Sequence, residues 1–431
     1  MNKHRALPVA IAAVLAAPFG SAQDMNFDDF SFDDFSSVTG DFNTVTTPPS
    51  VRTVIEQRLN GQHDDLLTGW STRVSTELTQ PLNAHVFFNL DGGLDLHWPT
   101  EWDGEDTDWV RTQGHINKAT LETSRDQWQA SVGLQSLVWG KVEGAGVVDV
   151  ASPQALSLGS DIGGSKVAQF MLIGNWFRGN QQLGFFVTPK PGFSIDLGAD
   201  IDLTDPTLAT QVTQLQPVLT AMDAAPPEFG LSALTQLGRL ELSLYGARLV
   251  PDLPVIDGGT GDILLDPYWL AGLSSTYPFG NTLLKVDLAY KNELVPAQAN
   301  GGMLSALGEA RDRVDAAVGL EHNHQRYGTF LTFATVEAWL NDEGLNDDER
   351  LTGNFAASWQ KAFFNDQLTT GLTAFTTLQR DTLVSIGTLG YDYSDAWNLG
   401  LSLTHYWADD GSPLAVQNGD VHYQATAAYS F

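Results

Sequence analysis

Hydrophobic and polar residues alternate regularly along several stretches of this chain. In 239–248 one set consists of Leu240, Leu242, Leu244 and Gly246, and the other of Arg239, Glu241, Ser243, Tyr245 and Ala247. A period of two residues is typical of a β-strand with one face in an apolar medium and the other in water. The same pattern recurs in 284–291 and in 397–404.

Eighteen segments have this strand-like character. They lie near 51–60, 67–80, 83–97, 109–124, 127–139, 166–178, 181–189, 228–237, 239–250, 267–277, 281–292, 313–322, 325–340, 352–363, 366–378, 381–393, 396–408 and 421–431. Sixteen strands are the alternative, because strand ends are hard to place from one sequence.

The connections between the segments alternate between short and long. Short ones include 179–180 and 238, and long ones include 140–165 and 190–227. One short connection, 378–380, falls among the long ones. This asymmetry predicts an all-β fold, a transmembrane antiparallel up-and-down β-barrel with long extracellular loops and short periplasmic turns.

The last segment ends on an aromatic residue. Tyr423, Tyr429 and Phe431 share its apolar face, which we expect to lie in lipid. A C-terminal Phe with aromatic residues at alternate positions resembles the assembly signal of bacterial outer-membrane barrels. That resemblance implies that Tyr429 and Phe431 are recognised by the barrel assembly machinery.

The start of the chain predicts export. Lys3 and Arg5 precede the apolar stretch 6–17, and small residues follow to Ala22. This is the pattern of a signal peptide, here 1–22, and the stretch is shorter than the ~20 residues of a membrane-spanning helix. We therefore expect the cell outer membrane of a Gram-negative bacterium as the location.

The segment 23–50 differs from the barrel, which we place at 51–431. It is acidic and rich in Phe, and it ends near Pro48 and Pro49. Like charges repel and proline interrupts strand pairing, so we predict a disordered periplasmic tail. A docking peptide for a periplasmic or exporter partner is the alternative.

The composition of the chain limits its possible functions. The chain has 52 acidic and 22 basic residues, a net charge of −30, and no cysteine. Nucleic-acid binding is excluded as a role because phosphates require Lys and Arg, and no disulfide or zinc–thiolate site can form. The acids concentrate in 101–108 and 342–349, which are either solvated loops or loops that attract cations.

One internal motif resembles a known family. A strand runs into Trp139-Gly140-Lys141, and Glu143, Gly144, Asp149 and Pro153 follow. This is similar to a poorly characterised family of proteobacterial porin-like outer-membrane proteins, often encoded near efflux-type exporters. The resemblance implies a barrel but carries over neither a substrate nor a catalytic residue. Gln154 stands where that family often has Asp.

Charged residues at inward positions are candidates for the lining of a lumen. The loop residues Lys141, Glu143 and Asp149 either bend into the lumen as a constriction or close the loop on itself. On the strands, the charges either create a transverse field or neutralise one another. The strand candidates are Glu241, Lys285, Asp287, Lys291, Arg313, Asp315 and Glu321.

Other signals are weaker. Helical spacing in 205–223 predicts a short helix, and a second is expected within 303–312. Gly159 to Lys166 only approximates a phosphate-binding loop. His405 lies in an aromatic girdle, and His322 and His324 lack a third ligand, so we expect no metal and no cofactor.

These patterns lead to one functional hypothesis, a porin-like channel for passive passage of small solutes or ions. We expect no enzymatic activity. We do expect contacts with outer-membrane lipid and lipopolysaccharide, and a modest preference for cations because of the net charge. A non-conducting structural or docking barrel that partners an envelope exporter is the alternative. An outer-membrane hydrolase is a distant third.

Overall fold

The structure of this chain is a computed structural model. It describes residues 48–63, 65–98, 110–153, 156–157, 166–192, 195–196, 221–222, 224–252, 255–257, 259–300, 303–340, 345, 347–377, 382–409 and 418–431. The proposed signal peptide and nearly all of the acidic tail lie outside these residues.

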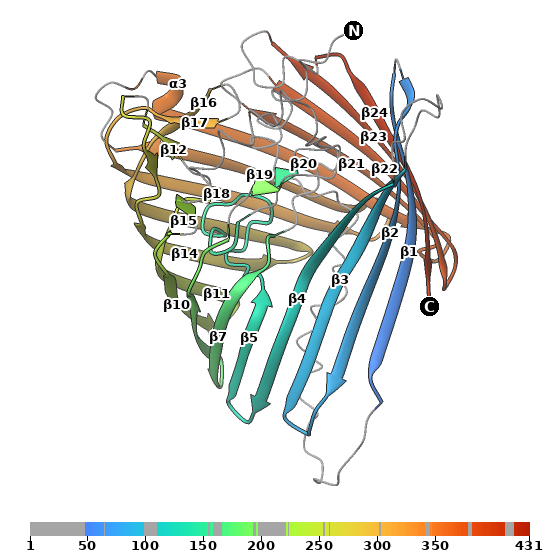
Figure 1. The fold of residues 1–431 in the computed structure, drawn as a ribbon, viewed down its shortest axis with the longest axis horizontal. Helices are drawn as coiled ribbons and strands as arrows, with labels where there is room; N and C mark the ends of the chain where they lie inside the picture. The colour runs from blue at the N-terminus through green and yellow to red at the C-terminus, as the bar shows by residue number, and fades with distance from the viewer. Residues whose placement is uncertain are drawn as a thin grey trace.

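Eighteen strands form one closed antiparallel sheet, drawn as a barrel in Figure 1. In order around the barrel they are β1 (Ser50–Gln62), β2 (Asp65–Pro81), β3 (Val86–Trp98), β4 (Arg111–Arg125), β5 (Trp128–Gln135), β7 (Gln169–Arg178), β8 (Gln181–Thr188), β10 (Glu228–Leu237), β11 (Leu240–Leu249), β14 (Tyr268–Phe279), β15 (Thr282–Leu294), β18 (Arg311–His324), β19 (Gly328–Trp339), β20 (Leu351–Phe363), β21 (Leu368–Thr377), β22 (Thr382–Ser394), β23 (Trp397–Ala408) and β24 (Val421–Ser430). The predicted fold class and the count of eighteen strands are confirmed, and each strand overlaps its predicted segment.

The barrel closes where the first strand meets the last. β1 pairs with β2 on one side and with β24 on the other. Beyond the end of β24, Phe431 and Thr53 exchange two backbone hydrogen bonds of 3.0 Å. The terminal aromatic residue therefore completes the ladder, and its ring lies 5.8 Å from that of Tyr429.

The two faces of the wall differ as the alternation predicted. On β23, Leu399, Leu401 and Leu403 are 41–49 % exposed on the outer face, whereas the intervening Ser402 and Thr404 face inward. Most large apolar side chains of the other strands are also exposed on the outer face, but some, such as Met171, Phe186 and Phe333, are buried on the inner side. An apolar belt around a polar interior is the arrangement of a barrel that stands in lipid.

The two ends of the barrel are unequal. At one end the strands are joined by tight turns such as 126–127, 179–180, 238–239 and 395–396, and we call it the short-turn end. The other, the long-loop end, carries most of the long connections. The connection between β1 and β2 is an additional short one there, and the predicted short connection 378–380 lies outside the described residues.

Small elements lie within the long connections. Two loops meet in a four-stranded sheet of β12 (Val255–Ile256), β13 (Ile263–Leu264), β16 (Ala297–Asn300) and β17 (Met303–Ala306). The others are β6 (Leu156–Ser157), β9 (Ile195–Asp196) and the short helix α3 (Asp347–Arg350). In the part of the chain that the structure describes, no helix is long and apolar enough to cross a membrane.

Two local predictions were wrong. The helix expected within 303–312 is the strand β17, because Met303 to Ala306 pair with β16 in a hairpin and the tertiary pairing overrides helix propensity. The strand expected over 127–139 ends at Gln135, where the chain leaves the wall. The helix predicted over 205–223 falls almost entirely outside the described residues.

The assignment of faces can be tested on neighbouring residues of β23. Replacing outward Leu401 by Arg should lower the free energy of unfolding by roughly 2–4 kcal/mol, because a charge then faces hydrocarbon. Ser402→Arg, one residue along, should cost far less. Urea titration of both variants in lipid vesicles measures the difference, and equal losses would show that the two faces are not distinct.

Candidate functional site

A loop folds back into the barrel immediately after β5. We call residues 136–153 the inward loop, and Figure 1 shows it inside the ring of strands. Its side chains Trp139, Val142, Val147, Val148 and Ala151 are each no more than 7 % exposed. The loop is therefore a packed element of the interior.

Aromatic packing fixes the start of this loop against the wall. The Trp139 ring lies 5.3 Å from Phe186 of β8 and 4.9 Å from Tyr245 of β11, centroid to centroid. A Cβ at Gly230 of β10 would lie 2.8 Å from the Trp139 ring. The wall can accept the indole only because residue 230 has no side chain.

Asp287 of β15 holds the tip of the loop. Its carboxylate accepts the backbone N–H of Lys141 at 3.0 and 3.1 Å and that of Val142 at 3.0 Å. The Gly140 N–H donates to the Tyr245 hydroxyl at 3.3 Å. Gly140 has φ = 92°, and a Cβ there would meet Asp287 at 2.8 Å, so this turn requires glycine.

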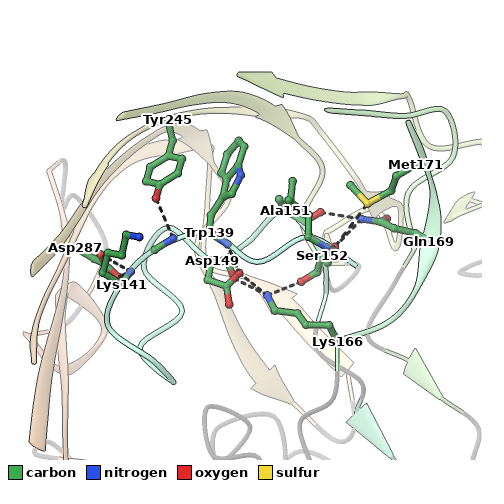
Figure 2. A network of polar contacts seen from close by, with 12 residues as sticks. Trp139, Lys141, Asp149, Ala151, Ser152, Lys166, Gln169, Met171, Tyr245 and Asp287 are labelled. Atoms are coloured by element: carbon green, nitrogen blue, oxygen red, sulfur yellow. Dashed lines mark hydrogen bonds and ion pairs between the residues drawn. The ribbon is translucent and has the colours of Figure 1, made fainter. Parts of the chain in front are cut away.

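The other end of the loop is fastened by a second set of polar contacts, shown with the first in Figure 2. The Asp149 carboxylate accepts a hydrogen bond from the backbone N–H of Trp139 at 2.9 Å and forms an ion pair with Lys166 at 3.0 Å. The Lys166 ammonium also donates to the carbonyls of Asp149 and Ser152, both at 2.9 Å. Gln169 of β7 donates to the Ala151 carbonyl at 2.8 Å. These contacts hold buried backbone groups that would otherwise lack partners.

Two charged side chains of the loop pair with the wall. Lys141 forms an ion pair with Glu241 of β11. Glu143 lies 2.6 Å from Lys285 of β15, which also pairs with Glu321 of β18 at 2.8 Å. Of the two readings of the loop left open by the sequence, its position corresponds to bending into the lumen. Opposite charges thus join the loop directly to two strands, β11 and β15, and Lys285 extends the group to β18.

A second ion-pair group lies nearer the long-loop end. Asp315 is 2.7 Å from Lys291 and 2.8 Å from Arg313. Arg313 also reaches Glu337 of β19 at 2.9 Å and stands 5.3 Å from the Trp339 ring. Lys291 and Asp315 are almost fully buried, so each charge depends on its partner for compensation.

All ten lumen candidates therefore lie on one arc of the wall or on the loop that covers it. Sequence reasoning missed Tyr245, Lys166 and Glu337. Tyr245 and Glu337 occupy inward positions of their strands, but a polar residue at such a position gives no sign of what it contacts. In the sequence, Gly159 to Lys166 were considered only as a possible phosphate-binding loop. In the structure, Lys166 contacts Asp149 and Ser152 of the inward loop.

Another charged group, also missed, lines the opposite wall. Arg73 of β2 lies 2.6 Å from Asp95 of β3, and His115 of β4 lies 3.2 Å from the same carboxylate. Lys118 pairs with Glu122 at 2.8 Å. Asp95 stands between the apolar Leu94 and Leu96, a signal that was present in the sequence, whereas a register shift between β3 and β4 disturbs the alternation of β4. The interior thus has two charged walls that face each other.

One acid near the inward loop titrates close to neutral pH. Burial raises the pKa of Asp252, in the connection after β11, to about 6, although Lys166 and Lys291 oppose the shift. The charge of this region therefore changes between roughly pH 5 and 7.

Comparison with known proteins places the fold. No protein-family model matches the chain, and no curated protein matches it. Solved structures do, and what they share with it is the fold, a closed antiparallel β-barrel of eighteen strands.

Among these structures is OccK1 (OpdK) of Pseudomonas aeruginosa, an outer-membrane protein, with a TM-score of 0.54, 10% identity and coverage of 89% of this chain and 98% of that one. OccD3 (OpdP) of the same organism has a TM-score of 0.53 and 8% identity, and the match covers 90% of this chain and 93% of that one. OccK2 (OpdF) of Pseudomonas aeruginosa, solved in complex with glucuronate, has a TM-score of 0.53 and 11% identity, and the match covers 89% of this chain and 98% of that one. At such identities the likeness shows the fold alone.

The hold of Asp287 on the loop gives a testable consequence. In Asp287→Asn the side chain keeps its size but loses its charge and one acceptor oxygen. Hydrogen bonds to charged groups contribute about 1.5–3 kcal/mol, so amide exchange in 139–148 should become at least about tenfold faster. Hydrogen–deuterium exchange followed by peptide mass spectrometry measures this. Asp95→Asn on the opposite wall is the control, and equal exchange in both variants would contradict the assignment.

Proposed function

We propose that this protein is an outer-membrane channel through which small solutes or ions pass passively. One observation carries the proposal: a closed eighteen-stranded barrel, apolar outside and polar inside, contains a loop folded against one arc of its inner wall. A barrel of this size encloses an aqueous lumen. The inward loop narrows that lumen. The proposal also includes export by the signal peptide 1–22 and an orientation with the short-turn end in the periplasm.

The lining of the path would be made of paired charges. On the loop side the carboxylates outnumber the cations. The carboxylates are Glu143, Asp149, Glu241, Asp287, Asp315, Glu321 and Glu337, and the cations are Lys141, Lys166, Lys285, Lys291 and Arg313. Such an excess supports a modest preference for cations, and it gives no indication of a particular solute.

Single-channel recording of the purified, refolded protein in a planar bilayer tests the proposal. Discrete, stable conductance steps support a channel. The alternative is a docking barrel that works with an envelope exporter through residues 23–50. A silent bilayer from correctly folded, heat-modifiable protein would favour that alternative and overturn the channel.

Ion preference can be tested on two loop-side acids that contact the inward loop or belong to it and that keep about a third of their side-chain surface exposed. These are Glu143, at 33%, and Glu241, at 32%. In Glu143→Gln with Glu241→Gln two negative charges leave the path, and Lys141 loses its partner. The reversal potential across a KCl gradient should then shift toward anions, most clearly near 0.01 M salt, where the Debye length approaches ~30 Å.

A control for this double variant removes charge elsewhere. Asp366 lies in the exposed turn between β20 and β21 with φ = 65°, a conformation that Asn tolerates. Asp366→Asn should leave the reversal potential unchanged. If the double variant behaves like this control, the loop-side carboxylates do not set ion preference.

A further inference from the structure

Basic and aromatic residues gather on the lipid-facing side of the short-turn end. Arg125 of β4 stands opposite Trp128 of β5, which in turn stands opposite Trp176 of β7. The two indoles lie 6.3 Å apart, and Trp128 is 60% exposed. Arg178 follows Trp176 by two residues on the same face and is exposed like Arg125. We call Arg125 and Arg178 with these two indoles the first site.

A second site occupies a distant part of the same rim. Arg326 lies in the turn between β18 and β19, with its guanidinium 5.6 Å from the Tyr327 ring. Lys361 of β20 donates to the Arg326 carbonyl at 2.5 Å and stands 4.7 Å from the Phe363 ring. Trp359 donates to the Tyr327 carbonyl at 2.6 Å. The turn and the strand are thus tied together with two cations facing outward.

The cations of both sites lack acidic partners. Within the described residues, none of Arg125, Arg178, Arg326 and Lys361 forms an ion pair with a carboxylate. Ten of the eleven ion pairs seen among these residues involve the inward loop, the inner face of β11 to β19 or that of β2 to β4 instead. The acids of the sequence concentrate in the connections of the opposite end, such as 101–108 and 342–349. The turns of the short-turn end carry fewer acids, among them Asp126, Asp366 and Asp395, so this end is less acidic than the opposite one.

We propose that the two sites bind the phosphate headgroups of anionic phospholipids in the membrane leaflet that surrounds the short-turn end. Trp and Tyr rings settle at the level of the headgroups, and Arg and Lys beside them attract anionic lipid. An Arg fork can also bind a phosphate through two parallel hydrogen bonds. The proposal rests on the barrel spanning a bilayer, as the proposed function requires, but it does not depend on conduction.

Thermal unfolding in the presence of defined lipid tests the binding. Refolded protein in a neutral detergent is titrated with phosphatidylglycerol or with phosphatidylcholine, and the loss of heat-modifiable migration is followed. A ligand that binds only the native barrel raises the midpoint. Phosphatidylglycerol should raise it more than phosphatidylcholine, and high salt should reduce the difference.

Variants locate the effect. In the combined variant Arg125→Gln, Arg178→Gln, Arg326→Gln and Lys361→Gln, the apparent dissociation constant for phosphatidylglycerol should rise at least about tenfold. Replacing the three arginines by Lys instead, with Lys361 kept, should retain most of the response. A matched single pair compares Arg326→Gln with Lys118→Gln. Lys118 lies on the inner face of β4, where it pairs with Glu122 at 2.8 Å and does not face lipid.

The outcomes are distinct. Arg326→Gln should weaken the response to phosphatidylglycerol, and Lys118→Gln should leave it as in the wild type. An equal rise with both lipids, an unchanged response in the combined variant, or the same rise with inorganic phosphate alone would overturn the proposal. Conductance recorded on the same variants keeps this question apart from channel function, since lipid binding can fail while the pore still conducts.

Discussion

The pairing of every backbone N–H and C=O is the constraint on which this structure depends. Hydrocarbon offers no hydrogen-bond partner, so a sheet with a free edge cannot stand in it. β1 therefore has to meet β24, and the exchange of hydrogen bonds between Thr53 and Phe431 completes that seam at the last residue of the chain. The closed wall then fixes which side chains face outward and which face inward, because strand side chains alternate.

Closure of the barrel creates an interior in which charged side chains lose contact with water. Charged residues on the inward positions of β15 and β18 lose water when the inward loop covers them. Unpaired buried charge is costly, and here each charge has a partner on the loop or on a neighbouring strand. Asp287 shows the exchange most clearly, because it gives up water and receives three contacts from two backbone N–H groups. The same interactions that neutralise the wall hold the loop inside.

Much of the fold followed from the sequence, and less of the site. Period-two alternation is local, so all eighteen strands could be predicted, together with the two faces of strands such as β11, β15 and β23, whereas the phase of 109–124 and 325–340 stayed ambiguous. The strand 127–139 was placed too long because apolar residues, among them Leu137 and Trp139, continue past Gln135, although they fall in the phase of the inward polar positions of β5. The contacts of the loop could not be derived, since Lys141 and Glu241 are a hundred residues apart and only the closed barrel brings them together.

The charges of the chain also separate by position in a way that net charge alone conceals. A net charge of −30 suggests a uniformly acidic molecule. The acids, however, concentrate in the connections of the long-loop end, the paired charges line the interior, and arginines and a lysine lie among aromatic rings at the short-turn end. Each group has a different medium: open water, a narrow polar interior and the lipid headgroup region. Because screening in salt water is effective beyond ~8–10 Å, the groups act largely independently of one another. The acidic loops can therefore draw cations toward one end of the barrel without weakening the attraction of anionic lipid to the other.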